Sequence, residues 1–206
     1  MVTTKDWSAS SGTMQRYSYL KHKWQKIGSA ISVKVGRNGL GWGLGLHKTP
    51  KDAKYIKHEG DGKAPAGIFE LKNGFGYSKF NINYPYRVYH RYNHCVDDSN
   101  SKYYNQIIDS RSIKKDYKSF EYMKGKSDYY KYGIVVAHNK KSKSGMGSCI
   151  FIHIKDIPTA GCTVMREDEI KEILKWLDKS KNPLLIQAPQ GVIGTLLPFD
   201  REELSK

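Results

Sequence analysis

The chain has 206 residues, of which 38% are hydrophobic and 27% are charged, proportions typical of one folded domain and not of a disordered segment. No apolar run approaches the ~20 residues that a membrane-spanning helix needs, so we expect no membrane span. The net charge of +15 attracts polyanions, which makes nucleic acid and anionic cell-wall polymers the first partners to consider.

The basic residues do not follow a nucleic-acid-binding pattern. Fifteen tyrosines could stack on bases, but the lysines are scattered, and the sequence has no zinc spacing, recognition helix or RNP-like strand. A solvated basic surface explains the charge better. We therefore expect no nucleic-acid partner; steeply salt-dependent binding to single strands would contradict this expectation.

The first part of the chain contains short strands and glycine-rich turns. We interpret residues 1–30 as an N-terminal extension that packs on the domain. Residues 31–36 alternate apolar and polar side chains, which predicts a half-buried strand. The glycine-rich residues 36–45 lack the Gly-Lys-Ser/Thr ending of a phosphate loop and favour hairpin turns. A turn at 61–67 then leads into a strand at 68–71.

Residues 84–132 are rich in Tyr, Asn, Ser and Lys and have no clear periodicity. We expect short helical turns at 99–105 and 119–123. Binding residues concentrate on long connections of this kind. The segment is therefore interpreted as an irregular excursion from the sheet that forms a wall of the site.

Two apolar strands follow, at 133–137 and 150–154. Successive side chains of a strand point to opposite faces. In the second strand we expect one face to pack on the core and the other to line a cavity. The core face carries Ile150, Ile152 and Ile154, and the opposite face carries Cys149, Phe151 and His153.

One convincing helix is predicted from Arg166 to Asp178. Acidic residues fill its first turn, where the helix dipole favours them, and an apolar stripe runs along Ile170, Ile173, Leu174 and Leu177. A strand at 184–187 and a C-terminal tail at 190–206 complete the chain. The predicted fold class is mostly β (α+β), with one main helix and the Tyr-rich excursion.

The three cysteines, Cys95, Cys149 and Cys162, form no CxxC pair, so we expect no structural zinc and no other metal. A Cys95–Cys149 disulfide with one reactive thiol would fit an oxidising compartment, and three reduced thiols would fit the cytosol. The sequence leaves both alternatives open.

Cys162 and His153 are the candidate catalytic pair. An imidazole near a cysteine is the usual means of forming the reactive thiolate at neutral pH. Gly161 would let the backbone turn sharply before the helix, and the amides of Gly161, Cys162 and Thr163 could donate to an oxyanion. Such a pair performs acyl transfer. The competing interpretations are a buried structural cysteine and a satisfied core histidine.

The sequence GSCIFIH at 147–153, followed by PTAGC at 158–162, resembles the catalytic motif of the L,D-transpeptidase (YkuD-type) family. Upstream, GDGKAPAGIF at 60–69 is similar to that family's Thr-Pro-x-Gly-x-Phe segment. GRNG at 36–39, and CVDD at 95–98 with YYN at 103–105, resemble features of a divergent branch. The resemblance spans residues 31–189, which it implies are a β-sandwich-like catalytic domain.

The resemblance makes Cys162 the nucleophile, His153 its general base and Gly161 the motif glycine, with Thr159 at the motif's Ser/Thr. Ala160 replaces the family's second histidine, and Thr163 stands where many members have an arginine nearby. Something else must therefore complete the site. Thr159 and Thr163 are candidate substrate contacts. Further candidates have a structural role as the alternative: Ser148, Asp97, Asp98, Tyr104 and Asn105.

The implied reaction is attack by Cys162 on an L,D-peptide bond of a peptidoglycan stem peptide, with transfer of the acyl group to an amine or to water. It needs no metal or organic cofactor. The family generally works outside the cytoplasmic membrane, so we expect a periplasmic or secreted monomer whose targeting segment is absent from this chain, or an effector exported by another route. The alternative function is a non-catalytic cell-wall-binding domain.

Overall fold

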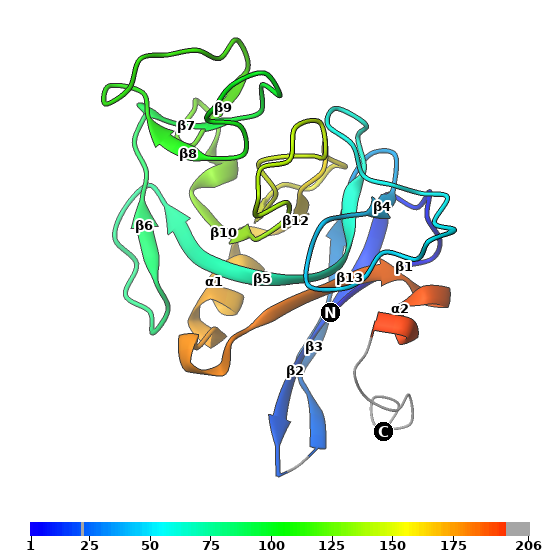
Figure 1. Cartoon of the computed structure of the whole chain (residues 1–206). Coiled ribbons are helices and arrows are strands. Elements are labelled where there is room, and N and C mark those ends of the chain that lie inside the picture. The colour runs from blue at the N-terminus through cyan, green and yellow to red at the C-terminus, as the bar shows by residue number, and fades with distance from the viewer. Residues whose placement is uncertain (22, 197–206) are drawn as a thin grey trace.

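The computed structural model describes residues 1–21 and 23–196 and confirms the mostly-β class (Figure 1). Two α-helices are described, α1 (Glu167–Trp176) and α2 (Gln190–Leu196), with short 3₁₀ turns at Asp128–Tyr130 and Lys179–Lys181. The strands are β1 (Val2–Thr4), β2 (Ser11–Leu20), β3 (Lys23–Lys34), β4 (Leu40–Trp42), β5 (Ala64–Gly76), β6 (Tyr86–Val88), β7 (Asn93–Val96), β8 (Ile107–Asp109), β9 (Phe120–Tyr122), β10 (Tyr132–Val136), β11 (Phe151–Ile154), β12 (Thr163–Met165) and β13 (Leu184–Pro189).

The main sheet closes on itself. Its strands follow the order β10-β11-β12-β3-β2-β1-β13-β5, and β5 also pairs with β10. The long strand β5 makes this closure, because it pairs with β13 through residues 67–70 and with β10 through residues 71–76. Strands β4 and β6 extend the sheet as further partners of β5.

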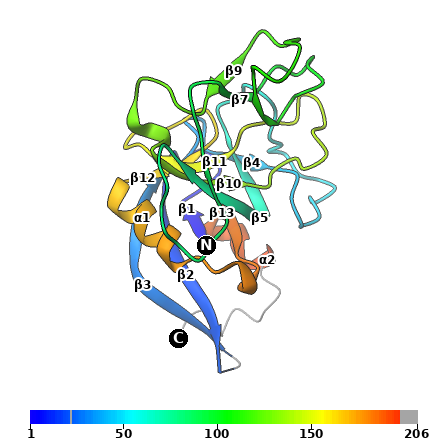
Figure 2. The same ribbon diagram turned by 90° about the vertical axis from the view of Figure 1, so that its left-hand side faces the viewer.

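The N-terminal residues lie within this sheet. β1 pairs in parallel with β13 and antiparallel with β2, and the Val2 side chain is fully buried. β3 begins at Lys23, eight residues before the strand predicted from the alternation at 31–36. The hairpin of β2 and β3 projects from the body of the molecule (Figures 1 and 2). The projecting part of β3 is mostly exposed, and its apolar residues Trp24 and Ile27 are three positions apart, so it shows no strict alternation by which its length could be predicted.

The Tyr-rich excursion contains a second, three-stranded sheet in the order β8-β7-β9. We call residues 93–122, which hold these strands, the cap; Figures 1 and 2 place it at the end of the molecule opposite the hairpin tip. The helical turn expected at 119–123 is wrong, because β9 occupies that position. His94 lies opposite Tyr122 and stacks on Phe120 at 3.9 Å between ring centroids. These cross-strand ring contacts favour the strand.

Two apolar clusters lie on the two faces of β11, as its alternation predicted. Ile150 and Ile152 belong to the main core, which also receives the buried stripe of α1. Cys149 and Phe151 belong to the second cluster, together with Cys162 and with Cys95 and Met123 from the cap side. The helix starts one residue later than predicted and ends two residues earlier. The nucleophile candidate therefore lies between the main sheet and the cap.

Candidate active site

Cys162 and His153 are held on one face of adjacent parallel strands. In the β11–β12 ladder, Ile152 pairs with Thr163 and His153 with Val164. Extending this register by one residue places Cys162 beside Phe151, on the face that also carries His153. Strand spacing and rise put the Cα atoms of Cys162 and His153 about 8 Å apart. Both residues therefore lie on the face of the strands that carries the second apolar cluster, but no hydrogen bond joins the two side chains within the described part of the chain.

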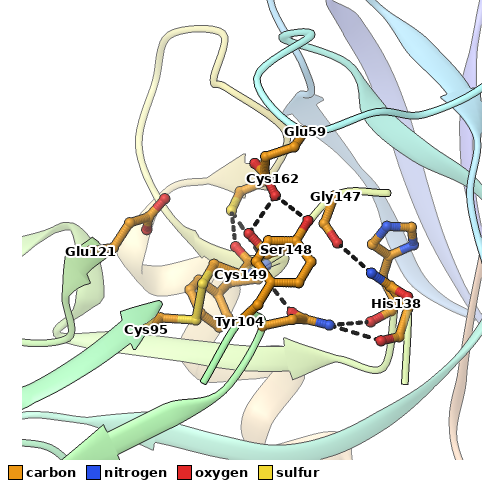
Figure 3. The surroundings of a disulfide bond; sticks show 12 residues. Glu59, Cys95, Tyr104, Glu121, His138, Gly147, Ser148, Cys149 and Cys162 are labelled. Atoms are coloured by element: carbon orange, nitrogen blue, oxygen red, sulfur yellow. Dashed lines mark hydrogen bonds between the residues drawn. A yellow bond between two sulfur atoms is a disulfide. The ribbon is translucent and has the colours of Figure 1, made fainter. Parts of the chain in front are cut away.

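The thiol is closed off from solvent. Cys162 is only 6% exposed and His153 only 5%. Among the described residues, the hydrogen bonds of the thiol go to the backbone: the Phe151 N–H donates to Sγ at 3.3 Å, and Sγ–H donates to the Cys149 carbonyl at 3.5 Å (Figure 3). Substrate can therefore reach sulfur only after the covering side chains move.

Burial sets the protonation of both groups. It raises the pKa of the Cys162 thiol well above the usual range, and the nearby Glu121 charge raises it further. Burial lowers the pKa of His153 to about 4, although the carbonyls of Ile154 and Tyr129 favour its charged form. A carbonyl only accepts, so Nδ1 carries the proton that it donates to Ile154 O at 3.1 Å, which leaves Nε2 as the basic nitrogen. The resting pair is thus a neutral thiol and a neutral imidazole.

The turn before Cys162 is built by Thr159. Its hydroxyl donates to the Cys162 carbonyl at 2.6 Å and accepts the Gly161 N–H at 3.1 Å. The Gly161 amide is therefore engaged within the turn and is not aimed at a substrate oxyanion. Close packing favours glycine here, since a Cβ would lie 3.1 Å from the Lys63 carbonyl oxygen and 3.2 Å from Ile150 Cδ1. Ala160 is exposed, so its position offers no support to the thiol.

A carboxylate that the sequence did not single out holds two of the predicted contacts. Glu59 accepts hydrogen bonds from the Tyr104 hydroxyl at 2.5 Å and the Ser148 hydroxyl at 2.6 Å (Figure 3). Asn105 accepts the Cys149 N–H at 3.0 Å and donates to the His138 carbonyl at 3.1 Å. These residues order the segment that leads into β11.

Cys95 and Cys149 form a disulfide, which joins β7 of the cap to that same segment (Figure 3). Cys162 remains a free thiol. Of the two alternatives that the sequence left open, the structure contains the disulfide with one unpaired cysteine. The bond fixes the cap over the nucleophile.

Of the remaining predicted substrate contacts, one lies near Glu121, one lies in the cap loops and one lies in the core. Asp97 follows β7 and lies near Glu121. Asp98 accepts backbone N–H groups of Asn100 and Lys118 and so orders the cap loops. Thr163 lies on the opposite face of β12 from Cys162, where its hydroxyl donates to Gln187 Oε1 at 2.7 Å inside the core. The structure does not bring Thr163 to the thiol.

Several charged or polar groups near the thiol were not predicted from the sequence. Glu121 accepts a hydrogen bond from the Tyr130 hydroxyl, and the Tyr130 ring meets the His153 ring edge-on at 4.8 Å. Lys57 is 2% exposed and pairs with Asp61 at 2.6 Å. No sequence pattern marks these residues, because contacts between distant parts of the chain bring them to the site: Glu121 through the cap sheet, and Lys57 through pairing of its segment with Trp42.

Among residues 1–21 and 23–196, no group of three or more His, Cys, Asp or Glu side chains is arranged to hold a metal ion. Within the same residues, no helix is both long and apolar enough to cross a bilayer. No protein-family model matches the chain, and no curated protein or solved structure matches it.

Proposed function

We propose that the chain is a divergent L,D-transpeptidase that forms a thioester between Cys162 and a peptidoglycan stem peptide and passes the acyl group to an amine, or to water as an L,D-carboxypeptidase. The observation that carries the proposal is the placement of Cys162 and His153 on one face of β11 and β12. The motif resemblance at 147–162 supplies the substrate class. The mostly-β class agrees with the fold that the resemblance implies, although the main sheet closes on itself and does not form a sandwich of two packed sheets.

The chemistry follows from the protonation states. His153 Nε2 takes the thiol proton as sulfur attacks the peptide carbonyl carbon, and the C–N bond then breaks as the leaving amine receives that proton. The Phe151 N–H stabilises the developing thiolate from 3.3 Å. Lys57 and Lys155 act in the same direction, since their charges lower the pKa of the thiol.

The disulfide supports a location outside the cytoplasm. Structural disulfides persist in oxidising compartments and are rare in the cytosol. Cys95 and Cys149 are both buried, at 2% and 4% exposure, which suits a permanent structural bond. We therefore place the protein in the periplasm or outside the cell, acting as a monomer.

The reaction is tested by incubating tetrapeptide muropeptides with the wild type and with Cys162→Ala, and analysing the products by mass spectrometry. The wild type is expected to give tripeptides or cross-linked dimers, and the variant neither. Equal turnover by the Cys162→Ala protein would overturn the mechanism. Circular dichroism checks that the variant keeps its fold.

One observation favours a second candidate function, a non-catalytic peptidoglycan-binding domain. The thiol is nearly inaccessible and its pKa is raised, both of which oppose nucleophilic attack. This alternative predicts co-sedimentation with purified sacculi together with unchanged muropeptides. Any Cys162-dependent product would exclude it.

A further inference from the structure

The cap presents an acidic face to the nucleophile. Cys95 on β7 and Glu121 on β9 are directly paired, so their side chains share one face of the cap sheet. Asp97, two residues after Cys95, continues the same alternation. Cys95 is bonded to Cys149, whose carbonyl contacts the thiol, so this face looks toward Cys162 (Figure 3).

Within the described residues, neither carboxylate on this face forms an ion pair. Asp97 Oδ1 is buried and accepts no hydrogen bond from any residue in the described part of the chain. Among the same residues, the hydrogen bond that Glu121 accepts comes from the neutral Tyr130 hydroxyl. Lys155 is the cation that acts on Glu121, but its Nζ lies over the Tyr129 ring at 4.9 Å. Buried carboxylate oxygens without donors are unfavourable, and an arriving N–H group would satisfy them.

The titration of Glu121 agrees with a group that exchanges protons. Burial raises its pKa to about 7, against the Tyr130 hydrogen bond, and the charges of Asp97 and Glu59 raise it further while Lys155 lowers it. The same carboxylate raises the pKa of Cys162. A general base works best when its pKa is near the working pH. This concentration of negative charge stands in a chain whose net charge is +15.

We infer that Asp97 and Glu121 bind the ammonium group of the acceptor amine and that Glu121 takes its proton before the amine attacks the thioester on Cys162. The inference rests on the proposed function and deepens it. It assigns the acceptor as a cationic primary amine. It also supplies a group that completes a site in which Ala160 cannot act.

In the transfer of the acyl group to the acceptor amine, the Glu121 carboxylate removes one proton from R–NH₃⁺ and becomes neutral. The free amine forms a C–N bond to the thioester carbonyl carbon, and the C–S bond breaks with its electron pair going to sulfur. The second amine proton passes to the Cys162 thiolate through His153, which leaves an amide, a thiol and a protonated Glu121. Glu121 then releases its proton to solvent.

The test compares Glu121→Gln with the wild type, using 1,5-diaminopentane as a cationic acceptor and hydroxylamine as an acceptor that is already neutral at neutral pH. The thioester is first confirmed by intact mass. We expect Glu121→Gln to lower aminolysis by diaminopentane by about 100-fold, the low end for general-base catalysis. Reaction with hydroxylamine should fall far less, because that amine has no proton to lose before attack.

Two further variants sharpen the comparison. Glu121→Asp keeps the carboxylate and should restore part of the diaminopentane reaction, which a purely structural role would not require. Glu70→Gln removes an exposed carboxylate on β5 that pairs with Lys140, and is the matched control expected to leave both reactions unaltered.

A Glu121→Gln protein that forms the thioester and uses both amines as the wild type does would overturn the inference. An equal loss with both amines would also overturn it, because a structural defect does not distinguish them. Absence of a thioester on the wild type is a different outcome, since it overturns the proposed function itself.

Discussion

Breaking the Cys95–Cys149 disulfide removes the covalent cross-link between the cap and the segment that precedes β11. The two cysteines are separated by 54 residues. A cross-link that closes a loop of this length restricts the unfolded chain enough to stabilise the fold by about 4 kcal/mol in the chain-entropy account. We expect reduction to lower the free energy of unfolding by nearly this amount.

Urea unfolding of the oxidised and reduced wild type measures this loss, since the two samples differ only in that bond. The Cys95→Ala/Cys149→Ala double variant gives the loss independently of reductant. Cys162→Ala is the control, because its unfolding should respond to reductant as the wild type does. A loss below about 1 kcal/mol, no larger than that of an average substitution, would refute the claim that the bond anchors the cap.

Three further predictions concern stability. Thr163→Val leaves Gln187 Oε1 without its donor and should lower the free energy of unfolding by about 1–3 kcal/mol in urea titrations, with turnover unaffected. Burial lowers the pKa values of His138 and His153 to about 4. The stability that the two neutral rings contribute is therefore full above pH 6.5 and is lost as the pH falls toward 4, by up to about 3 kcal/mol for each residue. A free energy of unfolding that does not change between pH 6.5 and pH 4 would contradict this. The raised pKa of Glu121 has the opposite sign, with stability lost as pH rises through about 7. Glu121→Gln should therefore raise the melting temperature above pH 7 relative to the wild type.

The elements that the sequence predicted are those with a strong local period. The alternation at 150–154 identified both faces of β11, and the stripe from Ile170 to Leu177 identified α1. Both patterns depend on residues close together in the chain. β1 and β12 have three residues each, too few to show a period, and each pairs with a distant strand, β13 and β3, as well as with its neighbour, β2 and β11.

The site residues also fall into those that a local pattern predicted and those that only long-range contacts place. The alternation at 149–154 was enough to predict that His153 faces away from the isoleucine face. The common face of His153 and Cys162 follows from the β11–β12 register, which was not predicted, and in that register Thr163 lies on the opposite face, where its hydroxyl bonds to Gln187. Glu121 lies near the thiol because β7 pairs with β9 and because a disulfide joins two cysteines that are 54 residues apart. Neither contact can be predicted from the residues next to Glu121 in the chain.

The central claim is that Cys162 carries the acyl group. Intact-mass spectrometry of the protein mixed with tetrapeptide muropeptides, followed by peptide mapping of the adduct, tests it directly. The account predicts an adduct with the mass of the muropeptide less one molecule of the released terminal amino acid, located on Cys162, removed by hydroxylamine and absent from Cys162→Ala. An unmodified wild type throughout turnover, or the same adduct on the Cys162→Ala protein, would contradict it.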